Sequence, residues 1–271
     1  MAIKWIATDM DGTLLTHDSR LSPRTVAAVQ SAMAHGAKFV LCSGRMIEAM
    51  LSYAKDLSVN APYVAYNGGA VYDMAAEKIL HQRAIPGADA VALAKFAEDL
   101  GLHVQGYREG GYYVAYENEY SQFYAGSIRI NAIPVGMPIS EWINGDQMKL
   151  LIIADPKRIA EVLPLFQAQF KGKVNCINSM PYFIECIAPQ VDKSEGLAVL
   201  GEILQLSPDE LLAFGDGGND CEMLQFAKYG YAMASGSQLA KDAAAYIAPP
   251  FDEDGVAQVI EEYIAKGMIG K

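Results

Sequence analysis

The sequence predicts an α/β protein with an α+β domain inserted into it. In residues 1–84 and 189–271, short apolar strands alternate with amphipathic helical segments, the pattern that builds a mostly parallel sheet. In residues 85–188 the order helix, strand, strand occurs twice, which favours an antiparallel sheet with helices on one face. Two strands of the first pattern end in acidic clusters, which indicates a functional site in that part.

Composition limits the classes of partner. The chain has 271 residues, of which 52% are hydrophobic, enough for a substantial core. Its formal charge of −11 disfavours nucleic acid and anionic membranes as partners, because both would repel it. No apolar run approaches the roughly 20 residues that span a bilayer, and a strand predicted from residue 3 leaves no room for a secretory signal. We therefore expect a cytoplasmic protein.

The first predicted strand ends in two carboxylates. Four of the five residues of Ile3–Ala7 are apolar, and Asp9 and Asp11 follow this run. Side chains two apart on an extended segment point the same way, so the two carboxylates could face one point. Gly12 permits a tight turn, and Thr13 adds a hydroxyl and an N–H group. Two close carboxylates need a cation or a shared proton, and Mg²⁺ is the expected cation because it prefers such oxygen ligands. A helix-loop-helix calcium site is excluded, since Thr13 and Arg20 stand where it needs acidic or amide ligands.

The second strand repeats this plan. Ser22 and Pro23 suit the start of a helix that ends at Gly36. An apolar strand over 37–42 is followed by Ser43-Gly44-Arg45 and a helix over 46–57. Ser43 at a helix N-terminus can hold an anion or simply cap the helix. A cysteine phosphatase is excluded, because its loop needs about five residues between Cys and Arg to surround a phosphate.

A third strand is expected over 62–66, and Asn67-Gly68-Gly69 predicts a turn that places Asn67 near the same sheet edge as Asp9. The domain over 85–188 follows. It is rich in aromatic residues, which either line a ligand pocket or pack the sheet, as aromatics favour strands. These residues are Tyr107, Tyr112, Tyr113, Tyr116, Tyr120, Phe123, Tyr124, Trp142 and Tyr182.

A second acidic cluster closes the pattern. Lys193 lies in the first turn of a helix expected to run to Leu204, where a cation opposes the helix dipole, so its placement suggests a function. The apolar strand 211–214 leads directly into Gly215-Asp216-Gly217-Gly218-Asn219-Asp220. Its glycine spacing does not fit a dinucleotide fingerprint. Two acidic clusters at strand ends again predict a metal.

The cysteines and histidines predict neither a zinc site nor a disulfide framework. Cys42, Cys176, Cys186 and Cys221 lack the paired spacing of such sites, and the four histidines are scattered. We expect all four cysteines to be reduced packing residues, in keeping with the cytoplasmic expectation.

The motifs Asp-x-Asp-Gly-Thr-Leu-Leu, Ser-Gly-Arg, Asp-Lys and Gly-Asp-x-x-Asn-Asp, in this order, resemble those of the haloacid dehalogenase (HAD) superfamily. The closest likeness is to the Cof-type sugar-phosphate phosphatases, which carry a large α/β cap. The resemblance covers nearly the full length. It implies a doubly wound, Rossmann-like parallel core over 1–84 and 189–271 and a cap over 85–188, with the site beyond the carboxyl ends of the core strands.

The resemblance also implies roles. Asp9 corresponds to the nucleophile, Asp11 to the general acid and base, and Lys193 to a residue that stabilises the transferring phosphoryl group. Asp9, the backbone carbonyl of Asp11, and Asp216 correspond to ligands of Mg²⁺, and Asp220 to an acid outside the coordination shell. The residues expected to bind substrate or phosphate are Thr13, Ser43, Gly44, Arg45 and Asn219. Ser194 departs from the family pattern, which usually has Gly there.

The expected activity is Mg²⁺-dependent hydrolysis of a small phosphorylated metabolite, a sugar phosphate or phosphorylated cofactor, by a monomer or small homo-oligomer. Asp11 favours phosphoryl transfer over dehalogenation, since the namesake dehalogenases lack this acid. Two alternatives stay open at this point: a phosphomutase, which needs water excluded from the site, and a non-catalytic sugar-phosphate sensor. Turnover of a generic phosphate ester separates the sensor from the enzyme.

Overall fold

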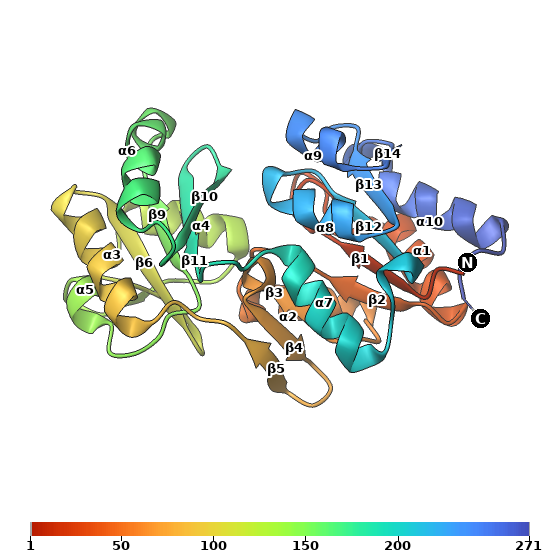
Figure 1. Cartoon of the computed structure of the whole chain (residues 1–271), viewed down its shortest axis with the longest axis horizontal. Coiled ribbons are helices and arrows are strands. Elements are labelled where there is room, and N and C mark those ends of the chain that lie inside the picture. Colours follow the sequence, from red (N-terminus) through yellow and green to blue (C-terminus); the bar gives the residue numbers. More distant parts are fainter. Residues whose placement is uncertain (1, 271) are drawn as a thin grey trace. The chain divides into compact units, whose positions relative to one another are not determined.

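The computed structural model describes residues 2–270, and the chain divides into two compact units (Figure 1). The first unit consists of the residues up to Gly44, Met50–His81 and those from Asp192 onward. The second consists of Arg45–Ala49 and Gln82–Val191. The boundaries 85–188 for a cap, and the role of the second unit as a cap, stay predictions.

The first unit is built on a parallel sheet of five strands. The strand order β14-β13-β12-β1-β2 places β1 between two strands that are far apart in sequence. Thr8 at the end of β1 pairs with Leu41 on one side and Phe214 on the other, so the loops after all three strands begin at the same edge. The strands are β1 (Trp5–Thr8), β2 (Lys38–Leu41), β12 (Leu211–Gly215), β13 (Tyr229–Met233) and β14 (Tyr246–Ala248).

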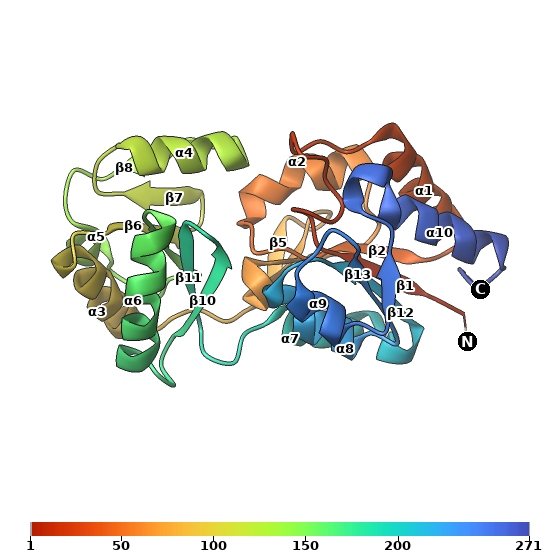
Figure 2. The ribbon, with the colours of Figure 1, turned by 90° about the horizontal axis from the view of Figure 1, so that it is seen from above.

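Helices cover both faces of this sheet (Figure 2), which explains why its strands are apolar throughout. On one face, Trp5 and Ala7 pack in one buried cluster with Leu197 of α7. Helices α1 and α10 lie on the other face. The order of strands, with helices on both faces, confirms the doubly wound prediction. The helices are α1 (Pro23–Ala34), α2 (Ile47–Leu57), α7 (Lys193–Leu204), α8 (Cys221–Phe226), α9 (Gln238–Ala243) and α10 (Gly255–Ala265), with short turns η2 (Pro208–Glu210), η3 (Gly218–Asp220) and η4 (Phe251–Glu253).

A small antiparallel sheet extends this unit. Its strands are β3 (Tyr63–Ala65), β4 (Ala70–Asp73) and β5 (Lys78–Gln82), and a parallel bridge joins Cys42 to Val64 of β3. The predicted turn after β3 is a short 3₁₀ segment, η1 (Tyr66–Gly68). The end of β3 therefore lies beside the end of β2.

The second unit contains a six-stranded sheet in the order β10-β11-β9-β6-β7-β8. All its pairings are antiparallel except β7 with β8. The predicted helix, strand, strand order is present in both halves. The strands are β6 (His103–Arg108), β7 (Gly111–Val114), β8 (Ile133–Pro134), β9 (Leu150–Ile153), β10 (Asn175–Met180) and β11 (Phe183–Ile187).

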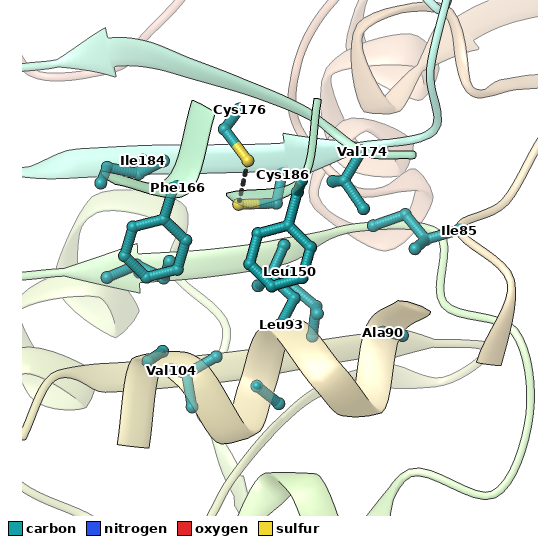
Figure 3. Close-up of a cluster of buried hydrophobic side chains, with 14 of the residues drawn as sticks. Ile85, Ala90, Leu93, Val104, Leu150, Phe166, Val174, Cys176, Ile184 and Cys186 are labelled. Carbon is teal, nitrogen blue, oxygen red and sulfur yellow. Dashed lines mark hydrogen bonds between the residues drawn. The ribbon is translucent and has the colours of Figure 1, made fainter. Parts of the chain in front are cut away.

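One face of this sheet forms the core of the second unit with helices α3 (Gly87–Asp99), α5 (Ile139–Trp142) and α6 (Pro156–Gln169). Phe166 of α6 is fully buried in this core, and Cys176 lies opposite Cys186 with their sulfurs 3.6 Å apart (Figure 3). All four cysteines are free thiols, as expected.

Helix α4 (Glu119–Ile128) packs on the opposite face, which corrects the expectation of helices on one face only. Its Tyr124 contacts Tyr107 of β6 and Phe183 of β11. Val104, three residues before Tyr107, and Ile184, next to Phe183, are core residues on the other face. Side chains alternate between the faces of a strand, so Tyr124 must approach from the other side. Several of the aromatic residues therefore pack this sheet.

Within residues 2–270, none of the helices is both long and apolar enough to span a membrane.

Candidate active site

Asp9 lies one residue beyond β1, at the point where the strand order reverses between β1 and β12. Its N–H donates to the carbonyl of Phe214 at 2.9 Å, which continues the ladder to β12 and fixes its backbone. Its side chain is buried. Ligands of doubly wound proteins bind beyond the carboxyl ends of the strands at such a point.

The chain turns sharply after Asp9. The N–H groups of Leu14 and Leu15 both donate to the carbonyl of Met10, at 3.0 and 2.9 Å. The turn begins before Asp11, so the strand alternation that would align Asp11 with Asp9 no longer applies. Asp11 is not part of the carboxylate cluster that Asp9 forms, although its charge contributes to the raised pKa of Asp9.

This turn lies directly against the loop after β12. Gly12 has φ +81°, and a Cβ atom there would lie 2.5 Å from Oδ2 of Asp216. The hydroxyl of Thr13 donates to Oδ1 of Asp216 at 3.0 Å. Glycine is therefore needed at position 12 both for its backbone conformation and for the close approach of this carboxylate.

Lys193 joins two of the acids. It is the first residue of α7 and is fully buried. Its ammonium donates to Oδ1 of Asp9 at 2.5 Å and to Oδ1 of Asp220 at 2.6 Å. These contacts explain a cation in the first turn of a helix, where the dipole alone disfavours it.

Asp220 uses its second oxygen to hold the loop after β12. Its Oδ2 accepts the N–H groups of Asp216 and Gly217 at 2.9 and 2.8 Å. With Oδ1 on Lys193, both of its oxygens have protein donors. Asp220 therefore orients the loop and the lysine, which fits its predicted place outside a metal's coordination shell.

Three carboxylates crowd around this one lysine. Oxygens of Asp9, Asp216 and Asp220 all lie within 4.8 Å of one another. Burial raises the pKa of Asp9 well above its usual value; Lys193 lowers it in part, and Asp220 raises it further. Burial and then Asp220 raise the pKa of Asp216 to about 6, although the Thr13 hydrogen bond lowers it. When all three carboxylates are ionised, the cluster carries more negative charge than its one lysine offsets.

Lys193 stays protonated in this cluster. Burial lowers its pKa, but Asp220 and Asp9 outweigh burial and raise it above its ordinary value. A further cation would relieve the remaining repulsion between the acids. All the donors are oxygens, which suits a hard divalent ion such as Mg²⁺, so the residues present fit the predicted metal.

The predicted anion-binding segment follows β2. Ser43 is buried, and its N–H donates to the carbonyl of Val64 in β3 at 3.0 Å. Gly44 lies against the amide of Asn67: a Cβ atom at Gly44 would be 2.9 Å from both its Nδ2 and Oδ1. Arg45 is buried and groups with the second compact unit, and its role in binding substrate stays a prediction.

Asn67 also contacts Asn219, the last of the residues predicted to bind substrate or phosphate. Nδ2 of Asn219 donates to Oδ1 of Asn67 at 3.0 Å. The Asn-Gly turn signal placed Asn67 at this sheet edge but did not distinguish a functional amide from an ordinary turn. The structure brings together Asp9, Thr13, Lys193, Asp216 and Asp220, and separately Ser43, Gly44, Asn67 and Asn219.

Comparison with known proteins identifies the family. A family model described as haloacid dehalogenase-like hydrolase matches residues 6–260. The chain belongs to this family of hydrolases. The predicted family is confirmed.

Individual relatives agree. A protein of Streptococcus pyogenes, which carries a provisional phosphatase name, is 28% identical over 97% of this chain and 99% of its own. The 5-amino-6-(5-phospho-D-ribitylamino)uracil phosphatase YitU of Bacillus subtilis is 26% identical over 96% and 97%. The solved structure of the HAD subclass IIB sugar phosphatase BT4131 has a TM-score of 0.83 and 27% identity, over 96% of this chain and 98% of that one. The predicted class of enzyme, a phosphatase, is supported throughout.

Proposed function

We propose that the protein is a Mg²⁺-dependent phosphatase that hydrolyses a small phosphorylated metabolite through a phosphoryl group carried by Asp9. The observation that carries the proposal is the buried contact of Asp9 with Lys193 inside the carboxylate cluster with Asp216. Such a cluster pairs a nucleophilic carboxylate with fixed charges for the transferring phosphoryl group.

The first step breaks the substrate ester. Because Oδ1 of Asp9 accepts from Lys193, we assign the attack on phosphorus to Oδ2. A bond forms from Oδ2 to phosphorus as the bond from phosphorus to the ester oxygen breaks. Asp11 gives its proton to that departing oxygen, so the product leaves as an alcohol.

The second step restores the enzyme. Asp11, now ionised, takes a proton from water as the water oxygen attacks phosphorus. The bond from phosphorus to Oδ2 of Asp9 breaks, and inorganic phosphate leaves. Splitting hydrolysis in this way replaces one difficult displacement by two easier ones.

The other residues bind and orient. We propose that Asp9, the carbonyl of Asp11, and Asp216 hold Mg²⁺, which would stabilise charge on the phosphoryl oxygens when bound. Lys193 supplies a fixed positive charge, and Asp220 holds it in place. Thr13, Ser43, Gly44, Arg45 and Asn219 are assigned to binding the phosphoryl group or the rest of the substrate.

We propose a sugar phosphate or a phosphorylated cofactor or its precursor as substrate. The support comes from the names of BT4131 and YitU, which act on a sugar phosphate and a phosphorylated ribityl compound. The second unit, with its aromatic residues, is proposed as the cap that selects among such compounds. Acidic residues outnumber basic ones by 32 to 21, so binding of an anionic substrate depends on the local cations of the site.

Release of inorganic phosphate tests the proposal. A panel of sugar phosphates, nucleotides and phosphorylated cofactors is assayed with Mg²⁺ and with EDTA, on wild type, Asp9→Asn and Asp11→Asn. Asp56→Asn is the matched control, because Asp56 is an exposed acid of α2. We expect Mg²⁺-dependent turnover that Asp9→Asn abolishes and Asp56→Asn leaves unchanged. Equal turnover by wild type and Asp9→Asn, or none from any ester, would overturn the proposal.

A further inference from the structure

The turn after β3 has an unusual backbone. Tyr66, Asn67 and Gly68 are consecutive residues with positive φ, at 54°, 54° and 102°. Only glycine adopts this region freely; Asn tolerates it and a bulky residue such as Tyr does so at a cost in free energy. All three residues are buried. A strained turn of this kind persists only where the surrounding structure holds it, and such turns concentrate at functional sites.

The first constraint on this turn is helix α7. A Cβ atom at Gly68 would lie 1.9 Å from the carbonyl oxygen of Asp192, the residue that caps α7. A Cβ atom at Gly196, in the first turns of α7, would lie 2.9 Å from the Cα of Gly68. The backbone of the turn is therefore pressed against the helix end that carries Lys193.

The second constraint is the loop after β2. The N–H of Asn67 donates to the carbonyl of Ser43 at 3.0 Å. The Asn67 amide lies against Gly44, which has no side chain to displace it. The turn thus bridges the segment assigned to the phosphoryl group, through Asn67, and the start of α7, through Gly68.

The amide of Asn67 reaches one further loop. Its Oδ1 accepts from Nδ2 of Asn219 at 3.0 Å. A side-chain amide can rotate so that its oxygen and its NH₂ group exchange places. A hydrogen-bond acceptor beside it favours the orientation in which the NH₂ group points toward that acceptor. Nδ2 of Asn219 donates to Oδ1 of Asn67, so this contact restricts the rotation of the Asn219 amide.

We propose that Asn67 is a positioning residue for the phosphatase reaction, which acts by fixing the Asn219 amide against the loop of Ser43 and Gly44. This inference rests on the proposed function. The strained turn places the Asn67 amide beside both loops, against Gly44 and Asn219. The residue itself need not touch substrate.

Asn67→Gly tests the role of the side chain separately from the backbone. Glycine accepts φ near +54° without strain, so this variant removes the amide and retains the turn. We expect kcat/KM to fall about tenfold, the usual effect of losing one oriented hydrogen bond, mainly through a higher KM. Gln205→Gly is the matched control, since Gln205 has φ 56° at the end of α7 and should leave kcat/KM unchanged.

A double-mutant cycle identifies the route of the effect. If Asn67 acts through Asn219, the Asn67→Gly/Asn219→Ala enzyme should equal Asn219→Ala in kcat/KM within about twofold. A merely structural role would multiply the two losses. Asn67→Gly should unfold at a slightly lower temperature than wild type, because a buried hydrogen bond is lost while the backbone strain is relieved. Asn67→Ser provides a second variant that lacks the reach to Asn219.

Two outcomes would overturn the inference while leaving the proposed function intact. They are wild-type kcat/KM in Asn67→Gly, and multiplicative losses in the double mutant. Failure of wild type itself to hydrolyse any ester would instead sink the proposed function.

Discussion

The ammonium of Lys193 lies 2.5 Å from Oδ1 of Asp9, and both side chains are buried. This contact joins the first helical turn of α7 to the loop after β1, segments 184 residues apart in the chain. Loss of Lys193 would leave the buried Asp9 and Asp220 without their shared cation. Such losses are strongly destabilising, by about 3–5 kcal/mol.

Lys193→Met should therefore affect both activity and stability. We expect kcat to fall by about 10²–10³, because a fixed charge for the phosphoryl oxygens is lost. Unfolding in guanidinium should occur at lower concentration, because Asp9 and Asp220 lose their shared cation. Lys95→Met is the control, since Lys95 forms only an exposed pair with Asp99. A Lys193→Met enzyme with wild-type kcat would contradict the assigned role.

Binding of Mg²⁺ should weaken as the pH falls, because the raised pKa values of Asp9 and Asp216 favour their protonated forms. The pKa of Asp216 is raised to about 6 by burial and by Asp220, so its carboxylate becomes protonated near this pH and a poorer ligand. Thr13→Val removes a hydrogen bond that lowers this pKa, so its midpoint should move to higher pH. Calorimetric titration with Mg²⁺ from pH 5 to pH 8 measures both midpoints. Affinity that stays constant down to pH 5 would refute the assignment of Asp216.

His103 should make the second unit less stable in acid. Burial lowers its pKa to about 4, and both ring nitrogens face amide groups, those of Gln105 and Asn118. Between pH 6.5 and 4 the unfolded chain binds a proton that the folded chain does not, so stability falls as the pH falls. The difference reaches at most about 3 kcal/mol, at about 1.4 kcal/mol per tenfold change in proton affinity.

Comparison of wild type with His103→Gln measures this effect. The free energy of unfolding of wild type minus that of His103→Gln, measured in urea, should decrease from pH 7 to pH 4, because the unfolded wild-type chain gains a proton on His103 over this range. A difference in free energy of unfolding that is independent of pH would show that His103 binds its proton equally well in the folded and unfolded states.

Phe166→Ala should destabilise the second unit by about 3–5 kcal/mol, because it empties a fully buried site in the core. Phe166 packs edge-on against Phe96, with ring centroids 5.0 Å apart. Its neighbour Leu165 is 48% exposed, and Leu165→Ala should change stability by no more than about 0.5 kcal/mol. Equal effects of the two substitutions on guanidinium unfolding would contradict the position of α6.

Much of the first unit could be predicted because its signals are local. Apolar runs such as Trp5–Thr8 end abruptly at glycine or acidic residues, and a parallel sheet then brings those ends to one edge. Asp9 and Asp216 were placed in this way, and Lys193 was singled out by its position in the first turn of a helix. Their assigned roles came from the family resemblance and remain to be measured.

Other features depend on contacts that no local pattern records. Strand β5 consists mostly of polar, partly exposed residues, and α8 is a short helix directly after η3. Neither segment therefore has a clear hydrophobic periodicity in the sequence. Helix α4 covers the second face of its sheet because Tyr124 packs on Tyr107, a contact between distant residues. The importance of Asn67 depends on Asn219, 152 residues away.

The central claim is that Asp9 carries the phosphoryl group, and trapping that group tests it most directly. The Asp11→Asn enzyme is mixed with Mg²⁺ and 4-nitrophenyl phosphate, whose leaving group needs no proton, and is quenched in acid. Without the base, the phosphoryl group should accumulate on the enzyme, and mass spectrometry of peptides should locate it on Asp9. The Asp9→Asn/Asp11→Asn enzyme should carry none. A burst of 4-nitrophenol without a phosphoryl group on Asp9, or a phosphoryl group on another residue, would contradict the account.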